Sequence, residues 1–229
     1  MPRSLERVAL EAATAARKAD IAAAGAVDTA GNIVVVGRVA DGGGDDPDVG
    51  IVRYTTSGVL DPAFGYGGNL QVETDVWDEA RSVLARDDGG LVVGGQVNLG
   101  LVGGTAPLVV AYDAGGEQDA NFGVGGEVPP ESLPGLGIVT SMTRAVTGEI
   151  VLAAWAEGVG GFNDFGVARL TVDGQPDTAF GEEGVVTVDF FGSVDTAAAA
   201  AQQSDGKVVV VGEAKSGTTY VMGMIRTLP

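Results

Sequence analysis

The residues best suited to chemistry are carboxylates, and the densest group of them lies in a glycine-rich stretch at residues 41–48. The stretch contains four aspartates, Asp41, Asp45, Asp46 and Asp48. Carboxylate and carbonyl oxygens are the ligands that Ca²⁺ prefers, so these residues are a candidate metal site. Their spacing differs from the D-x-[DN]-x-[DN]-G pattern of an EF-hand. A solvated loop without an ion is the plainer interpretation, and we expect no cofactor besides this Ca²⁺.

Two further stretches combine an aromatic side chain with acids. Trp77 stands between Asp75 and Asp78, and Phe162 precedes Asp164. An aromatic ring can stack on a sugar while carboxylates bind its hydroxyls, so these five residues are candidates for ligand binding. The plainer interpretation is that Trp77 shields the edge of a sheet. Paired carboxylates can also hydrolyse glycosides, but any acidic chain offers such pairs by chance, and we assign no catalytic residue.

Two absences from the composition exclude whole classes of site. The chain has no cysteine, which excludes disulfides, thiolate nucleophiles and cysteine-bound zinc or iron–sulfur clusters. It has no histidine either, which excludes a Ser-His-Asp triad and imidazole metal ligands. Any chemistry must therefore come from carboxylates, hydroxyls, Arg, Lys or a bound ion.

The balance of charge narrows the choice of partner. With 31 acidic and 13 basic residues, the formal net charge is −18. Phosphate contacts require a basic surface, so we expect no nucleic-acid partner and no binding to an anionic membrane. No window approaches the roughly 18–20 apolar residues of a membrane span. Solubility explains the charge most simply, while cation binding or a basic partner is the sharper interpretation.

Three anchor motifs recur along the chain and reveal its organisation. The first is a turn and a β-branched run that closes on a glycine, as at residues 205–212, with turn glycines at positions 31, 89, 148 and 206. The second is a turn of the type Leu-Asp-x-x-Phe-Gly, with its phenylalanines at positions 64, 122 and 180. The third is a strand-like segment that ends as Arg53-Tyr54 does. The steps of 58 and 59 residues indicate one repeat unit.

Each repeat unit contains four apolar segments of strand length between turn signals, which is typical of a propeller blade. We therefore predict an all-β protein, a single β-propeller domain over residues 1–229 with four blades of four antiparallel strands. The predicted repeats are 20–68, 69–126, 127–184 and 185–229. Alanine-rich segments such as residues 197–201 favour a helix by propensity, but their place in the repeat predicts innermost strands.

Closure of the ring is predicted from the two ends of the chain. The last repeat lacks a fourth segment, and residues 1–19 precede the first. We expect residues near 6–12 to complete the last blade and close the ring, which would protect the sheet edges. The Ala, Glu and Arg content of residues 5–18 favours a helix instead. Closure within a monomer is the simpler expectation, and two chains joined into an eight-bladed ring are the alternative.

The three anchors resemble the delta-60 repeat family of bacterial β-propeller repeats. Its pattern runs Asp-Gly-Lys-Ile-Val-Val-x-Gly, then x-Arg-Tyr, then Gly-x-Leu-Asp-x-x-Phe-Gly, and residues 205–212, 53–54 and 60–65 match it. The resemblance covers about residues 20–226 and departs at Ala111, which replaces the arginine. It implies a propeller of unknown function at an extracellular or cell-surface location. A cytoplasmic location is the alternative, because residues 1–20 lack the apolar core of a signal peptide.

Residues that recur in every repeat are expected to be structural. The aspartates at 61, 119 and 177 should cap turns, the phenylalanines should fill the space between blades, and the arginines at 53, 169 and 226 should bridge blades. Function should lie in the loops that differ, between strands two and three and between blades, which share one face. We expect a non-enzymatic scaffold that binds a ligand, such as a carbohydrate, or a protein partner there. A carboxylate-based hydrolase of a polysaccharide or lactone, with or without a dependence on Ca²⁺, is the alternative.

Overall fold

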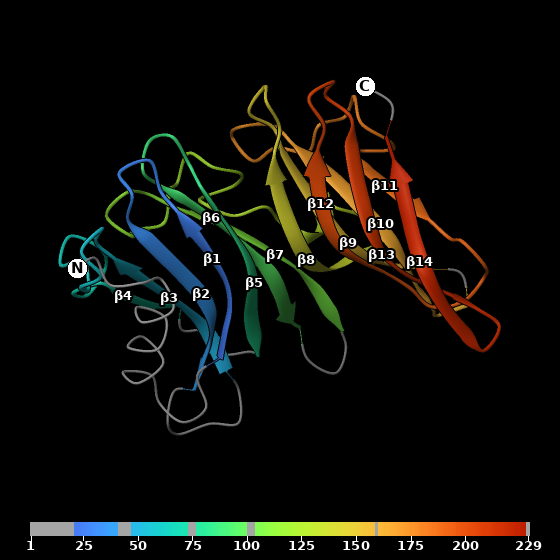
Figure 1. Cartoon of the computed structure of the whole chain (residues 1–229), viewed down its shortest axis with the longest axis horizontal. Helices are drawn as coiled ribbons and strands as arrows, with labels where there is room; N and C mark the ends of the chain where they lie inside the picture. Colours follow the sequence, from blue (N-terminus) through green and yellow to red (C-terminus); the bar gives the residue numbers. More distant parts are fainter. Residues whose placement is uncertain (1–20, 41–46, 73–76, 100–103, 159, 228–229) are drawn as a thin grey trace.

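The computed structural model describes residues 21–40, 47–72, 77–99, 104–158 and 160–227. These residues form an all-β architecture of four antiparallel sheets, which follow one another along an arc (Figure 1). No helix in the described part of the chain has the length and hydrophobicity to cross a membrane. The predicted propeller-like arrangement of four successive sheets is therefore confirmed.

Each sheet consists of strands that are consecutive in the sequence. The first sheet contains β1 (Ile21–Val27), β2 (Ile33–Ala40), β3 (Pro47–Tyr54) and β4 (Asn69–Val72). The second contains β5 (Asp78–Ala85), β6 (Leu91–Asn98) and β7 (Thr105–Tyr112), and the 3₁₀ turn η1 (Pro130–Ser132) follows it. The third contains β8 (Leu136–Arg144), β9 (Ile150–Glu157), β10 (Asn163–Leu170) and β11 (Val185–Val188). The fourth contains β12 (Asp195–Gln202), β13 (Val208–Ser216) and β14 (Thr219–Arg226).

The prediction of four strands in every blade holds for the first and third sheets. In the second sheet the fourth strand is reduced to an isolated bridge between Val110 and Glu127. In the fourth sheet three strands are described, and the predicted strand near residues 6–12 lies outside the described residues. Completion of the last blade by the N-terminal segment therefore stays a prediction.

The alanine-rich segment of the last repeat is a strand, β12, as its place in the repeat predicted. The first strand of each sheet has a bulge, for example between Ala197 and Ala199. This irregularity explains the glycine that closes the run in the first, second and fourth repeats, while Ala154 stands at that position in the third. A Cβ added to Gly37 would lie 1.9 Å from the carbonyl oxygen of Ile21, and one added to Gly212 would lie 2.0 Å from that of Thr196. Only glycine fits where the bulged strand approaches so closely.

Three hydrophobic clusters fill the spaces between neighbouring sheets. Alternate residues of the second strands point to opposite neighbours, as the period of two requires. Val34 and Val36 of β2 pack with Leu91 and Val93 of β6 between the first and second sheets. Further clusters join the second sheet to the third and the third to the fourth. Among the described residues, the first and fourth sheets do not pack on each other, so the expected closed ring is not observed.

Candidate cation-binding site

The residues that recur in each repeat make the turn-capping and blade-bridging contacts expected of structural residues. In the first blade Arg53 Nε donates to Asp61 Oδ2 at 2.8 Å, and Arg53 Nη1 donates to the Ala114 carbonyl oxygen of the next blade at 2.8 Å. The guanidinium also lies 4.5 Å from the centroid of the Phe64 ring. Asp61 Oδ1 accepts from the Ala63 N–H and caps the turn. The predicted capping and bridging roles are thus observed in this blade.

The second blade lacks the arginine, because Ala111 occupies its position. Arg86 lies in the turn between β5 and β6 of that blade and supplies the missing guanidinium. Its Nη1 donates to Asp119 Oδ2 at 2.6 Å. This pair holds the pKa of Asp119 below its usual range, with the N–H of Asn121 also contributing. The ion pair is therefore retained, although a residue at a different position in the blade provides the cation.

A second group of acids converges at the opposite end of the third and fourth blades. Asp164 is the second residue of β10, Asp189 follows β11, and Asp195 begins β12. One carboxylate oxygen of each lies within 4.8 Å of the others. Asp164 lies just after the loop between strands two and three, Asp189 lies in the loop between blades, and Asp195 lies just after that loop. The prediction that these two loop types share one face is consistent with this cluster.

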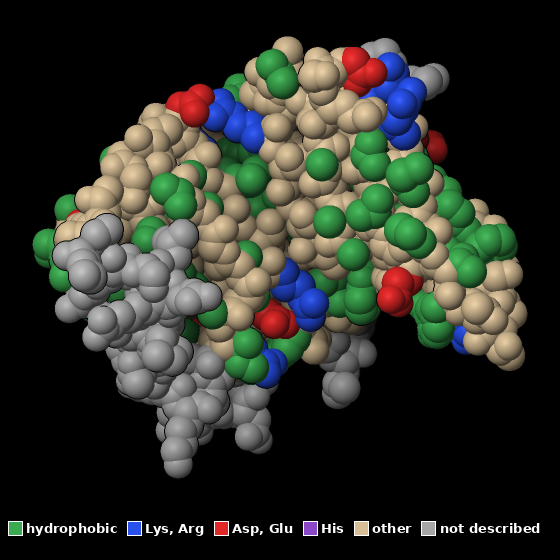
Figure 2. Space-filling model, in the orientation of Figure 1, with side chains coloured by type: hydrophobic (Ala, Val, Ile, Leu, Met, Phe, Trp, Pro, Cys, Tyr) green, Lys and Arg blue, Asp and Glu red, His purple; other side chains and the backbone are tan. Residues whose placement is uncertain are grey.

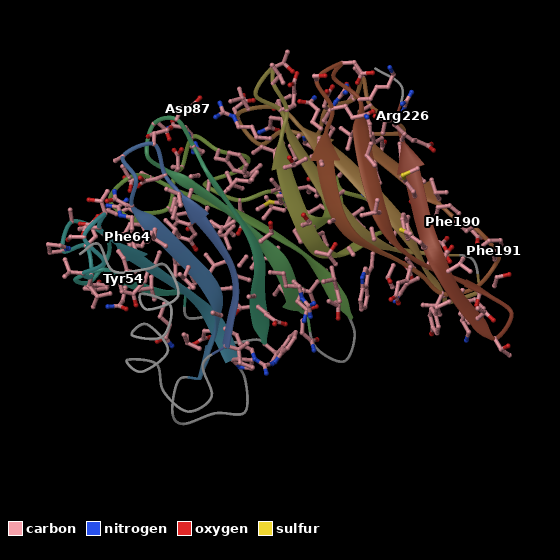
Figure 3. The ribbon with its side chains drawn as sticks, in the orientation of Figure 1. Tyr54, Phe64, Asp87, Phe190, Phe191 and Arg226 are labelled. Carbon is pink, nitrogen blue, oxygen red and sulfur yellow. The ribbon has the colours of Figure 1, made fainter. Side chains whose placement is uncertain are left out.

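Backbone N–H groups and an aromatic pair fix two of the three carboxylates. Asp195 is fully buried, and its two oxygens accept from the N–H groups of Phe190 at 2.8 Å and Lys215 at 3.1 Å. Asp189 is exposed and accepts from the N–H groups of Phe191 and Gly192. The Phe190 ring packs edge-on against Phe165, with centroids 5.0 Å apart. Figure 3 shows Phe190 and Phe191 beside β14. The loop between blades is therefore held in place.

Asp164 differs from its two neighbours because no described residue donates a hydrogen bond to its carboxylate. It is only 6% exposed. Burial raises the pKa of Asp164, and the negative charges of Asp189 and Asp195 raise it further. Gly158 leaves the room for this carboxylate, since an added Cβ would lie 2.4 Å from Asp164 Oδ2. The site therefore contains a buried acid that lacks a donor and faces two other acids.

This arrangement suits a hard cation. Oxygen ligands lie about 2.3–2.6 Å from Ca²⁺, so two ligands on opposite sides of the ion are about 4.6–5.2 Å apart. The separation of up to 4.8 Å between the three oxygens fits one such ion. A cation would also offset the repulsion between the three carboxylates, two of which are buried. The three residues could supply three of the six to eight oxygen ligands that Ca²⁺ takes.

The candidate residues predicted from the sequence are divided between this site and other places. Asp41, Asp45, Asp46 and Asp75 lie outside the described residues. Asp48 is buried in β3, where it accepts from Gln71 Nε2 at 2.8 Å. Phe162 is 44% exposed and stands two residues before Asp164. Trp77 is half-buried, and its carbonyl oxygen accepts from the Asn98 N–H. The roles predicted for these residues stay predictions.

The strand register relates two of the predicted acids to the observed cluster. Asp48 faces Val39 and Asp164 faces Ala156, which are equivalent positions in the first and third blades. Asp78 faces Val97 and Asp195 faces Ala214, which are equivalent in the second and fourth blades. Ala106, which faces Val97, and Leu136, which faces Ala156, take these places between the second and third blades. Comparing acids by repeat position, rather than by density in the sequence, would have grouped Asp164 with Asp195.

A cavity of about 550 Å³ lies at the other end of β10, away from the acids. Its lining includes Arg169, Phe180, Ile225 and Arg226. Arg169 is paired with Asp177 at 2.6 Å, as Arg53 is with Asp61. Arg226 occupies the equivalent place in the fourth blade, at the end of β14 in Figure 3, and forms no ion pair with a described carboxylate. This cavity therefore borders the recurring structural residues.

Three segments of the chain, residues 31–64, 147–180 and 203–229, match the model of a family described as a domain of unknown function (DUF5122) beta-propeller. The matches begin at or near the turn glycines, and the first two end at the phenylalanines of the recurring turn. They support a β-propeller repeat family of unknown function, while the delta-60 name remains a resemblance. No curated protein matches the chain.

Two solved structures are similar to this chain at low identity. A protein of unknown function from Bacteroides caccae has 13% identity and a TM-score of 0.47, with 92% of this chain and 62% of that chain covered. An α-L-arabinofuranosidase from Clostridium thermocellum has 10% identity and a TM-score of 0.47, with 95% of this chain and 72% of that chain covered. This chain thus spans 62% of the length of the Bacteroides protein.

Proposed function

We propose that this protein is a non-enzymatic β-propeller scaffold that binds a ligand through one acidic face, with a Ca²⁺ ion held by Asp164, Asp189 and Asp195. The observation that carries the proposal is the convergence of three carboxylate oxygens within 4.8 Å around an acid that lacks a hydrogen-bond donor. Recurring acids such as Asp61 and Asp177 are paired with arginines, whereas no described cation pairs with Asp164, so a bound cation would balance its charge.

The chemistry of the ion supports an oxygen-rich ligand. Three carboxylates leave about three to five coordination positions of Ca²⁺ to other oxygens, from the backbone, water or a ligand. Phe162 and Phe191 are 44% and 53% exposed, and they neighbour Asp164 and Asp189 in the sequence. A sugar hydroxyl could complete the coordination while an aromatic ring stacks on the sugar. A carbohydrate is therefore the ligand class we favour, and the proposed location outside the cytoplasm suits a site for Ca²⁺ of modest affinity.

The test is titration of the metal-free protein with Ca²⁺ in a calorimeter. We expect saturable binding at one site and weaker binding of Mg²⁺, which demands a smaller octahedral shell. At 100 times the dissociation constant, Ca²⁺ should raise the free energy of unfolding by about 2.7 kcal/mol. Asp164→Asn should remove both effects. Asp113→Asn changes the same charge in an exposed turn at the other end of the blades and serves as the control.

Two results would contradict this proposal. One is the absence of any heat of binding at millimolar Ca²⁺. The other is equal Ca²⁺ affinity in Asp164→Asn and in Asp113→Asn, which would mean that the net charge of −18 attracts the ion without a specific site.

A carboxylate-based hydrolase is the second candidate, and the raised pKa of Asp164 beside two other acids favours it. A protonated acid next to an ionised carboxylate is the arrangement that glycosidases use. The oxygens lie closer than the roughly 6.5–9.5 Å of inverting enzymes, so the retaining mechanism would apply. Turnover of polysaccharides or lactones that is lost in both Asp164→Asn and Asp195→Asn would establish this candidate. Ca²⁺ binding without turnover would favour the scaffold.

A further inference from the structure

The two ends of the arc expose surfaces that are buried everywhere else in the molecule. On the fourth sheet, Met222 and Met224 of β14 are 84% and 63% exposed. The strand register makes them equivalent to Val49 and Ile51 of β3 and to Phe165 and Val167 of β10. Those four residues are almost completely buried against the next sheet. The surface formed by Met222, Met224, Val209 and Val211 is called the trailing face below.

The first sheet shows the complementary feature. Ala22 of β1 is exposed, whereas its equivalents Ala80, Val139 and Ala197 are buried against the preceding sheet. Ile33 and Val35 of β2 are half-buried, although the same positions in the other three sheets are buried. The surface formed by Ala22, Gly25, Ile33 and Val35 is called the leading face. Leading and trailing faces meet at each of the three internal boundaries, and at the two ends of the arc each lacks its partner.

Figure 1 shows why the two faces do not satisfy each other within the described chain. The first and fourth sheets lie at opposite ends of the arc, and they do not pack on each other. In Figure 2 hydrophobic side chains gather over the region of β13 and β14. From these observations we infer that a second copy of this chain covers both faces. The trailing face of each copy packs on the leading face of the other, and the two arcs form a closed ring.

The sizes of the residues at the boundaries support this head-to-tail pairing. At the second boundary Gly94 makes room for Met142, since a Cβ added to Gly94 would lie 2.8 Å from Met142 Sδ. At the first boundary the equivalent residues are Val36 and Val83, which belong to one cluster. At the third they are Ala153 and Ala200. The boundary between copies would place Val211 against Gly25, a larger residue opposite a small one, as at the second boundary.

Ring symmetry favours two copies over an open array. Heterologous faces build a ring when the rotation between copies closes, and a filament when it does not. Two identical arcs related by a two-fold axis bury both faces twice and leave none exposed. Each copy carries a formal charge of −18, so the apolar faces must overcome a general repulsion that salt screens. The dimer should therefore strengthen as ionic strength rises.

Light scattering coupled to size exclusion tests the assembly. We expect a mass of twice the 22.9 kDa of one chain. The double variant Met222→Lys and Met224→Lys should run as a folded monomer, because it places two charges on the trailing face. Val124→Lys is the control, since Val124 is 63% exposed, like Met224, and lies in a turn away from both faces. A wild-type monomer at high micromolar concentration, or an equal effect of the control, would overturn the inference.

Cross-linking identifies the faces, because the wild-type chain has no cysteine to interfere. Gly25→Cys and Val211→Cys are made separately and mixed before mild oxidation. A covalent dimer should form only in the mixture, where one thiol of each kind meets across one boundary. A link within one chain in the double variant, with none in the mixture, would show that the monomer closes its own ring. A ladder of longer species from the double variant would show an open array, and either result would reject the closed dimer.

Discussion

The two ends of strand β10 carry acids in opposite circumstances. Near its last residues Arg169 pairs with Asp177 at 2.6 Å, and Asp177 also caps a turn through the Ala179 N–H. At its start Asp164 is buried, receives no hydrogen bond from a described residue and faces two further carboxylates. Burial without a donor destabilises a charge, whereas a paired and hydrogen-bonded carboxylate is tolerated.

The comparison shows how a repeat protein separates stability from binding. The end of the blades with Asp177 repeats in the first three units, and even the loss of its arginine at Ala111 is compensated by Arg86. The end with Asp164 changes from one boundary to the next, from Asp164 and Asp195 to Ala106 and Leu136. Substitutions at the repeating end should therefore unfold the protein, and substitutions at the variable end should alter its ligand and its response to pH.

The largest loss of stability is expected at the repeating end, from Phe64→Ala. Phe64 is completely buried between the first two blades, and its ring lies 3.0 Å from where a Cβ of Gly116 would stand. Removing the ring leaves a cavity and should lower the free energy of unfolding by about 3–5 kcal/mol. Urea unfolding followed by circular dichroism measures this loss. A loss as small as that of an exposed residue such as Val124→Ala would show that Phe64 is not part of the packed boundary.

A smaller loss is expected from Arg53→Met. The substitution leaves Asp61 buried without its cation and removes the hydrogen bond to Ala114. Breaking a buried pair in this way should lower the free energy of unfolding by about 3 kcal/mol. Arg169→Met is the matched control, because the side chain of Arg169 is 26% exposed against 6% for Arg53, and about 1 kcal/mol is expected there. Equal losses in the two variants would contradict the ranking by burial.

The repeat explains which features could be predicted from the sequence. The strand at the alanine-rich segment 197–201 was predicted against its propensity, because the turn at 205–206 fixed its place in the unit. The turn-capping role of Asp61 followed from its spacing to Phe64 in the same way. These features could be predicted because the same local spacing recurs in successive repeats. Each blade must pack on its neighbours in the same way, so the same residues recur at the same places.

The candidate site was harder to predict, because its residues come from two separate segments. Asp164, near the start of β10, meets Asp189 and Asp195, which flank the connection from β11 to β12, only once the third and fourth blades pack together. In the sequence the four aspartates of residues 41–48 are more conspicuous, although three of them lie outside the described residues. The substitution of Arg86 for the missing arginine was likewise invisible, because Arg86 and Asp119 are 33 positions apart. Long-range contacts of this kind depend on blade geometry rather than on any local pattern.

The smallest change in the free energy of unfolding is expected from Asp164→Asn with Ca²⁺ removed by a chelator. Unlike substitutions at the repeating end, this one should stabilise the protein. Since burial and two neighbouring carboxylates raise the pKa of Asp164, the folded state binds the proton more tightly than the unfolded chain does. The contribution of Asp164 to stability therefore rises as the pH falls from neutral through the raised pKa, and it stops changing below the ordinary pKa of the unfolded chain. Asp164→Asn lacks this titration, so it should be slightly more stable than the wild type at pH 7, and the difference should vanish in acid.

Urea unfolding at several pH values between 4 and 7 measures that difference. Asp177→Asn is the control, because Asp177 is paired with Arg169 and its loss should destabilise the protein at pH 7. Added Ca²⁺ should reverse the order of wild type and Asp164→Asn at pH 7, since only the wild type binds the ion through all three carboxylates. If Asp164→Asn instead destabilises the Ca²⁺-free protein at pH 7, the Asp164 carboxylate has a hydrogen-bond donor in solution. The carboxylates at the two ends of β10 would then both be stabilised by a partner, and the contrast between them would be wrong.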